Sequence, residues 1–174
     1  MLPLLVGSLL AFGCVKTGSV AVSQPVEAKV AQYDAIVVSA ASDTSDLQKY
    51  MPKLQEGVAK SLQKDKVFSS ATAGGAPPAG ALTLRMKVVK TTAGSKAARM
   101  FNVGGETEVE VTCELVDEQA NTTLAKFVAT GNSARKSKSS VNGFDTSIAD
   151  DLDGRAVRAA GEQIAAYLAE QTQN

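Results

Sequence analysis

The alternation of apolar and polar side chains is strongest from Glu106 to Asp117. One side of this segment is apolar or small and the other is mostly acidic, the first made by Val109, Val111, Cys113 and Leu115 and the second by Glu108, Glu110, Thr112 and Glu114. A period of two over this length is typical of a half-buried antiparallel strand. We therefore predict a strand here and place the other elements relative to it.

Two neighbouring segments repeat the pattern but carry basic polar residues. The polar positions include Arg85 and Lys87 in residues 82–88, and Lys126 in residues 124–130. The inward positions are apolar, at Leu82, Leu84, Met86 and Val88 in the first segment and at Ala125, Phe127 and Ala129 in the second. A cross-strand pair of opposite charge contributes roughly 0.2–1 kcal/mol. The charges therefore predict that the acidic strand lies between two basic ones, on a wet outer face.

The remaining segments predict two helices and further strands. Residues 33–41 form a β-branched run that fits a first strand, and residues 66–71 fit a weak second one. After the capping residues 43–46, apolar side chains recur at helical spacing at Leu47, Tyr50, Met51, Leu54, Val58 and Leu62. Pro52 requires this helix either to begin near Tyr50 after a short turn or to kink. A C-terminal helix is expected to start within residues 145–153, which carry four acids. Its apolar positions recur at helical spacing at Ile148, Leu152, Val157, Ala160, Ile164, Tyr167 and Leu168.

This order of elements predicts an α+β two-layer sandwich. We expect a mixed, mainly antiparallel sheet of four to five strands with two helices on one face, in the order strand-helix-strand-strand-strand-strand-helix. The chain has 174 residues, of which 44% are hydrophobic, so it is long enough for one domain with a substantial core and short for two.

Charge and composition argue against several classes of function. Basic and acidic residues are equal at 18 each, and aromatic residues make up 5%, which disfavours a nucleic-acid binder. The chain has no His, and this excludes every Ser-His, Cys-His and His-metal site. Catalysis by Lys, Tyr, Asp or Glu stays open. We expect no cofactor and no metal.

The first 14 residues are expected to be a lipoprotein signal peptide. The apolar run is too short to span a bilayer, and its end, Ala-Phe-Gly-Cys, resembles the lipobox of bacterial lipoprotein precursors, which implies lipidation at Cys14. The alternative is a buried N-terminal strand or helix. Residues 15–32 are expected to form a flexible tether, and residues 33–174 a single globular domain. Cys113, on the inward side of its strand, is expected to be a buried free thiol.

The chain resembles bacterial envelope lipoproteins of a domain family of unknown function. The likeness rests on the loop residues Gly94, Ser95, Ala97 and Arg99, on the strand from Val109 to Asp117, and on the closing helix after Asp145. At the level of fold the chain is also similar to outer-membrane lipoproteins that activate peptidoglycan synthases. The resemblance implies a binding or assembly role and brings no catalytic residue.

The connection from 91 to 105 is the best candidate for a binding site. It is long for a hairpin turn and carries two cations beside two apolar side chains, at Lys96, Arg99, Met100 and Phe101. The alternatives are a plain solvated loop, a phosphate-binding loop, and a plug for one end of the core. The row of glutamates could instead be read as a carboxylate cluster, but a charge-paired outer face fits its alternation better.

Two hypotheses about function follow. The first is a lipid-anchored, non-catalytic binding or assembly module of the bacterial cell envelope, facing the periplasm. Its partners would be membrane lipid through Cys14 and an envelope protein, without nucleic acid. Val15 after the cysteine favours the outer membrane, because an Asp retention signal is lacking. The second hypothesis is a secreted or periplasmic enzyme or small-ligand binder that uses the 91–105 loop.

Overall fold

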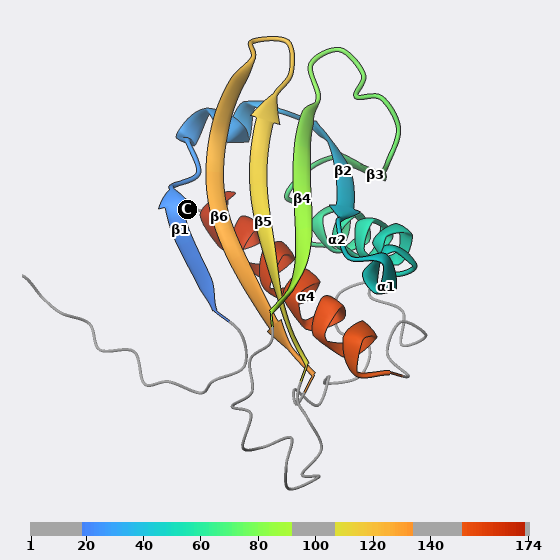
Figure 1. Cartoon of the computed structure of the whole chain (residues 1–174). Coiled ribbons are helices and arrows are strands. Elements are labelled where there is room, and N and C mark those ends of the chain that lie inside the picture. Colours follow the sequence, from blue (N-terminus) through green and yellow to red (C-terminus); the bar gives the residue numbers. More distant parts are fainter. Residues whose placement is uncertain (1–18, 92–106, 134–150, 173–174) are drawn as a thin grey trace, which may run out of the picture.

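A computed structural model describes residues 19–91, 107–133 and 151–172. These residues form two layers, a sheet and a layer of helices on one of its faces (Figure 1). The strands of the sheet are β1 (Val20–Gln24), β2 (Ala35–Ser42), β3 (Ser70–Ala73), β4 (Leu82–Thr91), β5 (Glu108–Asp117) and β6 (Thr122–Asn132). The helices are the 3-10 helix η1 (Ala28–Gln32), the short α1 (Ser45–Gln48), α2 (Met51–Lys64) and α4 (Leu152–Thr172). The predicted α+β two-layer class is confirmed.

The strands lie in the order β1-β6-β5-β4-β2-β3. Strands β4, β5, β6 and β1 pair antiparallel, whereas β2 runs parallel to both β3 and β4. The acidic strand β5 therefore lies between β4 and β6, as its charges predict. The register places Arg85 opposite Glu114, and Glu114 opposite Lys126.

The core lies between the sheet and the two long helices. Leu54, Val58 and Leu62 of α2 are fully buried, as are Val157, Ile164 and Leu168 of α4. They meet the predicted inward row of the sheet, which includes Leu84, Val111, Cys113, Leu115 and Phe127, each at most 1% exposed. Each helix buries one face and each strand one side, so the spacing of apolar residues determines which surfaces meet.

Helix α4 closely approaches the sheet at Gly131 on β6. A Cβ at this position would lie 2.1 Å from the carbonyl oxygen of Ala156 and 2.4 Å from the amide nitrogen of Ala160. Both atoms belong to the backbone of α4, so they cannot move aside as a flexible side chain would. The absence of a side chain at residue 131 therefore allows the helix to contact the strand directly.

Three local expectations have clear outcomes. The helix of residues 47–62 is in fact α1 followed by α2, which begins at Met51 with Pro52 in its first turn, so the first alternative for this proline is confirmed. Asn121 has a φ of 49° in the β5–β6 turn, as its side chain favours. The weak strand expected at 66–71 lies later, at Ser70–Ala73, because Lys66 adopts a φ of 55° and ends the α2 segment.

The prediction of a flexible tether at 15–32 is wrong from residue 19 onward. Val20–Gln24 form β1, which pairs with β6, and Ala28–Gln32 form η1, in which Val30 is 1% exposed. The sheet consequently has six strands rather than the expected four to five. The sequence did not indicate β1 because this strand is short and largely exposed on both sides, so its side chains do not alternate clearly. Its pairing partner, β6, also lies about a hundred residues away in the chain.

Candidate functional site

The outer face of the sheet, opposite the helices, is a candidate interaction surface. It is formed by the side chains that alternate with the core residues, among them Ser39, Arg85, Lys87, Val89, Glu108, Glu110, Thr112, Glu114, Lys126 and Thr130. Neither α2 nor α4 covers this face (Figure 1). Antiparallel sheets commonly pack one face against the core and expose the other face to water.

Ion pairs occupy one half of the outer face, toward the β5–β6 turn. Glu114 pairs with Lys126 at 2.8 Å, as the cross-strand register predicts. Arg85 lies opposite Glu114 but donates to both carboxylate oxygens of Glu118 in the turn, at 2.7 and 2.6 Å. The planar guanidinium matches a carboxylate in this two-point geometry, and the carboxylate of Glu114 is already paired with Lys126.

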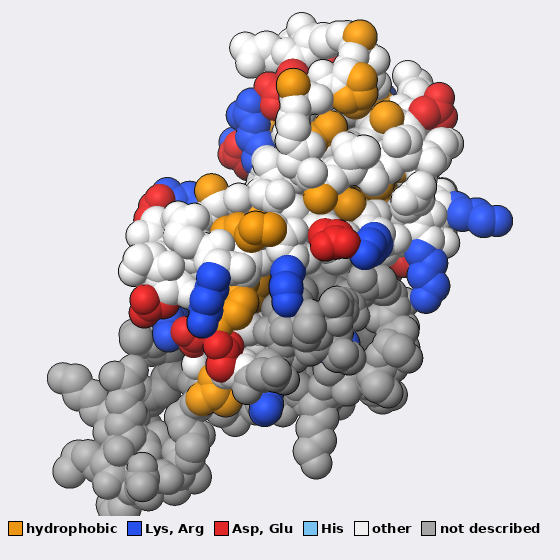
Figure 2. Space-filling view, turned by 90° about the vertical axis from the view of Figure 1, so that its right-hand side faces the viewer, with side chains coloured by type: hydrophobic (Ala, Val, Ile, Leu, Met, Phe, Trp, Pro, Cys, Tyr) orange, Lys and Arg blue, Asp and Glu red, His pale blue; other side chains and the backbone are white. Residues whose placement is uncertain are grey.

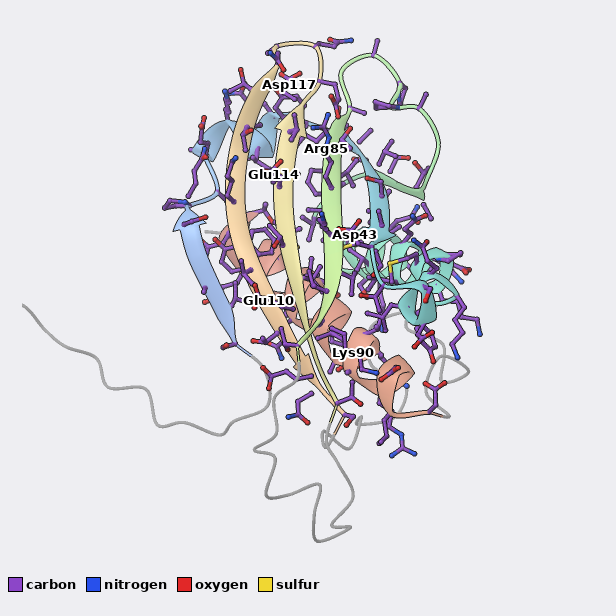
Figure 3. The ribbon with its side chains drawn as sticks, in the orientation of Figure 1. Asp43, Arg85, Lys90, Glu110, Glu114 and Asp117 are labelled. Carbon is purple, nitrogen blue, oxygen red and sulfur yellow. The ribbon has the colours of Figure 1, made fainter. Side chains whose placement is uncertain are left out.

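The other half of the outer face is less well paired. Lys87 binds Asp43 at the end of β2, at 2.6 Å, rather than a glutamate of β5. Glu110 lies between Val89 and Thr130, and Glu108 lies between Thr91 and Asn132. Neither glutamate has an ion-pair partner among residues 19–91, 107–133 and 151–172. The predicted charge lattice is therefore only partly formed, and this half of the face is acidic (Figure 3).

Lys90 does not lie on the outer face. It lies in the inward row of β4 and pairs with Asp153 of α4 at 2.8 Å. This contact fixes the beginning of α4 to the end of β4. Asp151 caps the same helix, because its Oδ1 accepts the backbone N–H of Gly154 at 2.8 Å. The acids expected to favour a helix start therefore act by capping and by pairing with a lysine.

The Asp151 carboxylate also joins α4 to the first helices. Its Oδ2 accepts the Tyr50 hydroxyl and lies 3.3 Å from Lys49 Nζ, while Lys49 lies over the Tyr50 ring. The hydrogen bond from Tyr50, followed by that from the Gly154 amide, lowers the pKa of Asp151. Burial, followed by the hydrogen bond to Asp151, raises the pKa of Tyr50. At neutral pH the carboxyl is thus ionised and the phenol neutral, so the Tyr50 hydroxyl donates a hydrogen bond that links α4 to the first helices.

A second tyrosine-aspartate pair lies at the opposite end of the sheet. The Tyr33 hydroxyl donates to Asp117 Oδ2 at 2.6 Å, and Asp117 Oδ1 accepts the backbone N–H groups of Gln119 and Ala120. The Tyr33 hydrogen bond, followed by that from the Ala120 amide, lowers the pKa of Asp117. Sequence reasoning missed both pairs. An Asp at the first position of a turn was the one available signal for Asp117.

The interaction residues predicted from sequence lie outside the described ranges. These are the lipidation residue Cys14 and the binding residues Lys96, Arg99, Met100 and Phe101. The two hypotheses for the 91–105 loop, a protein contact and an enzyme or ligand site, therefore stay predictions. No cluster of three metal-ligating side chains occurs within the described ranges. Cys113 is 0% exposed, as predicted, and burial raises the pKa of its thiol.

The ranges 19–91 and 107–133 each begin and end at the same end of the sheet (Figure 1). We call it the junction end, defined by Ser19, Thr91, Thr107 and Ser133. At this end Thr91 of β4 pairs with Glu108 of β5, and Glu108 pairs with Asn132 of β6. The Ser19 carbonyl accepts the amide of Thr130, two residues before Asn132 on β6. The opposite end, with the β5–β6 turn at residues 118–121, is called the turn end. The segment that carries Lys96 and Arg99 is thus attached at the junction end on both sides.

The surface offers little evidence for other kinds of site. Within the described ranges, no helix is both long enough and apolar enough to cross a bilayer. On the side seen in Figure 2, basic and acidic side chains are interspersed, and apolar ones reach the surface only in small groups. The large apolar side chains that are exposed in the described ranges are Val22, Val89 and Leu152. The open sheet face and the junction end remain the two surfaces of interest.

Solved structures with a similar fold include two of PelC. PelC from Paraburkholderia phytofirmans, described as a dodecamer, is 16% identical, with a TM-score of 0.52, and covers 91% of this chain and 100% of its own. A variant of the same dodecamer is 19% identical, with a TM-score of 0.53 and the same coverage. At these identities the likeness shows a common fold. A minor lipoprotein from Acinetobacter baumannii is more distant, at 14% identity and a TM-score of 0.40, covering 79% of this chain and 92% of its own.

Family membership comes from the sequence itself. A search among curated proteins finds no match. Residues 19–137 match the family described as a domain of unknown function, DUF4410. The match begins where the described fold begins, at residue 19, and includes every strand of the sheet. Because it spans more than half of the chain, the expected relationship to a family of unknown function is confirmed, and this protein belongs to the DUF4410 family.

Proposed function

We propose that this protein is a lipid-anchored lipoprotein of the bacterial cell envelope, facing the periplasm, that acts as a non-catalytic assembly module. The anchor is Cys14, and the favoured membrane is the outer one. The observation that carries the assembly role is the sheet face left open by the helices (Figure 1). PelC, which has the same fold over 91% of this chain, is described as a dodecamer, and this supports assembly of further copies.

The charges on the open face favour a contact between unlike surfaces. Two copies that met by the same face about an axis near Glu110 would bring Glu108 and Glu110 of each copy together without a described cation to separate them. Like charges opposed across an interface are unfavourable. The open face of one copy would therefore contact a different surface of the next copy. Such head-to-tail contacts close into rings when the rotation allows it.

The anchor and the oligomer are tested separately. Mass spectrometry of the native protein from membrane fractions should find a mature chain that begins with acylated Cys14. A chain that keeps residues 1–13, or a Cys14→Ser variant that stays in the membrane fraction, would contradict the anchor.

The oligomer is tested by light scattering and native mass spectrometry. The wild-type protein should be larger than a monomer, and Val89→Asp together with Thr112→Arg should lower its mass to that of a monomer. Both positions are exposed on the open face, Val89 near the end of β4 and Thr112 in the middle of β5. Gln63→Arg, on the exposed side of α2, is the matched control and should leave the mass unchanged. A monomeric wild type at high concentration would overturn the assembly proposal.

A further inference from the structure

We infer that the junction end of the sheet faces the lipid bilayer and that the turn end points away from it. This inference rests on the proposed lipidation of Cys14 and adds the orientation of the anchored domain. It follows from where the folded chain begins. Since β1 and Ser19 already belong to the sheet, only residues 15–18 separate the anchor from the fold.

The short connection limits how far the domain can stand from the membrane. Five residue steps lead from Cys14 to Ser19, and at a maximum of about 3.6 Å each they reach roughly 18 Å. A tether over 15–32, as the sequence suggested, would have been several times longer and would have imposed no orientation. The position of Ser19 within the fold therefore decides which poses are possible.

An inverted domain is incompatible with this limit. The Ser19 carbonyl accepts the Thr130 amide, and Thr130 pairs with Glu110. From Glu110 to Asp117 the strand advances seven residues, which is about 23 Å at ~3.3 Å per residue. The β5–β6 turn extends beyond Asp117. If the turn end touched the bilayer, Ser19 would stand more than about 23 Å above it, farther than the connection of ~18 Å can reach.

Exposed apolar side chains favour the junction end as the part of the domain that faces the bilayer. This end exposes Leu152 at the beginning of α4, 45% accessible, and Val89 lies near the end of β4, 40% accessible. Two of the three exposed large apolar side chains in the described ranges are therefore at or near this end, where the headgroup region can accept them.

The orientation can be measured on the mature protein, acylated at Cys14. Single cysteines are introduced at Leu152 for the junction end, at Gln119 for the turn end and at Gln63 for the α2 side, all exposed positions, and are labelled with a thiol-reactive fluorophore. Cys113 is 0% exposed, so the unmodified protein serves as the control for background labelling. Each labelled protein is bound to vesicles of phosphatidylethanolamine and phosphatidylglycerol in which some headgroups carry a nitroxide quencher.

The fluorophore at residue 152 should lose most of its emission, while those at residues 119 and 63 should keep theirs. If the Leu152→Cys variant fails to fold, Val89→Cys gives the second reading for this end. Stronger quenching at residue 119 or 63 than at residue 152, or equal quenching at all three, would overturn the orientation. Flotation of the unlabelled protein with quencher-free vesicles is read first. Failure to float contradicts the lipid anchor itself, whereas flotation with the wrong quenching pattern contradicts only the orientation.

Discussion

The Tyr33 hydroxyl donates to Asp117 Oδ2 at 2.6 Å and thereby joins the segment before β2 to the turn after β5. The other oxygen of the same carboxylate accepts the N–H groups of Gln119 and Ala120, each at 3.0 Å. One side chain therefore holds both the shape of the turn and its attachment to η1. The pKa of Tyr33 is raised, first by the hydrogen bond to Asp117 and then by burial, so the phenol stays a donor at neutral pH.

Tyr33→Phe should raise the pKa of Asp117, because the hydroxyl is the largest of the causes that lower it. A carboxyl whose pKa is depressed on folding adds stability above the ordinary aspartate value of 3.8, and this stability is lost as the pH falls through the folded value. The variant should thus melt below wild type at pH 7, and the difference should shrink toward pH 2. NMR titration of the Asp117 carboxyl gives the pKa, and melts at several pH values give the stability. An unchanged Asp117 titration would show that the hydrogen bond is absent in solution.

Asp151 should contribute to stability chiefly as the cap of α4. Replacing a helix-capping Asp by Ala typically costs about 1 kcal/mol, whereas Asn caps nearly as well as Asp. We therefore expect Asp151→Ala to lower the free energy of unfolding by about 1 kcal/mol and Asp151→Asn to lower it by less. Because the pKa of Asp151 is lowered on folding, wild type should lose this advantage as the pH falls below 3.8. Urea titrations at pH 7 and pH 3 check both statements; equal losses for Ala and Asn would contradict the capping role.

Gly131→Ala should strain the contact between β6 and α4. The new Cβ would lie 2.1 Å from the Ala156 carbonyl oxygen, so the helix must shift. Overpacking of this kind costs typically about 1–3 kcal/mol. Thr112→Ala, on the exposed side of the neighbouring strand, is the control and should change stability by at most about 0.5 kcal/mol. Thermal and chemical denaturation provide the measurement, and a Gly131→Ala variant as stable as wild type would mean that the helix can move away without cost.

Cys113 should not react with thiol reagents in the folded protein. The residue is 0% exposed, and burial raises the pKa of the thiol, so both access and the thiolate fraction are low. Labelling by a chromogenic disulfide should be slow in buffer and immediate in denaturant. Rapid labelling of the native protein would place this side of β5 in solvent and contradict the assigned core face.

Lys87→Gln should have little effect on stability. The Lys87 and Asp43 side chains pair at 2.6 Å but are 59% and 78% exposed, and exposed pairs contribute at most about 1 kcal/mol. The expected loss is well under about 1 kcal/mol and should vanish at high salt. A denaturant titration at low and high salt tests this, and a loss of several kcal/mol would show that the Lys87–Asp43 pair is not a solvent-exposed surface pair in solution.

The sequence was most informative where the side-chain period is regular. Alternation in Leu82–Val88 and Val109–Leu115 identified the inward rows of β4 and β5 and their order, since one face had to be buried. Helical spacing in the same way identified the faces of α2 and α4. These features depend on short-range patterns, which a single sequence contains.

Features that depend on distant partners could not be predicted in this way. Strand β1 is defined by its pairing with β6, and neither its composition nor its exposed side chains require a strand. Arg85 has Glu114 directly opposite but binds Glu118, because the path of the turn decides which carboxylate is within reach. The links from Tyr33 to Asp117 and from Tyr50 to Asp151 likewise join residues 84 and 101 positions apart. No local period marks either partner.

The course of α4 has a practical consequence for reporter proteins. The helix begins beside Lys90 at the junction end and, over 21 residues at about 1.5 Å each, advances roughly 30 Å toward η1 at the other end. A fluorescent protein or affinity tag fused after the helix would therefore be attached where α4 approaches β1 and η1 (Figure 1). In an anchored domain of the inferred orientation, that position lies farther from the bilayer than the beginning of α4, so a C-terminal fusion would leave the lipid contact of the junction end unobstructed.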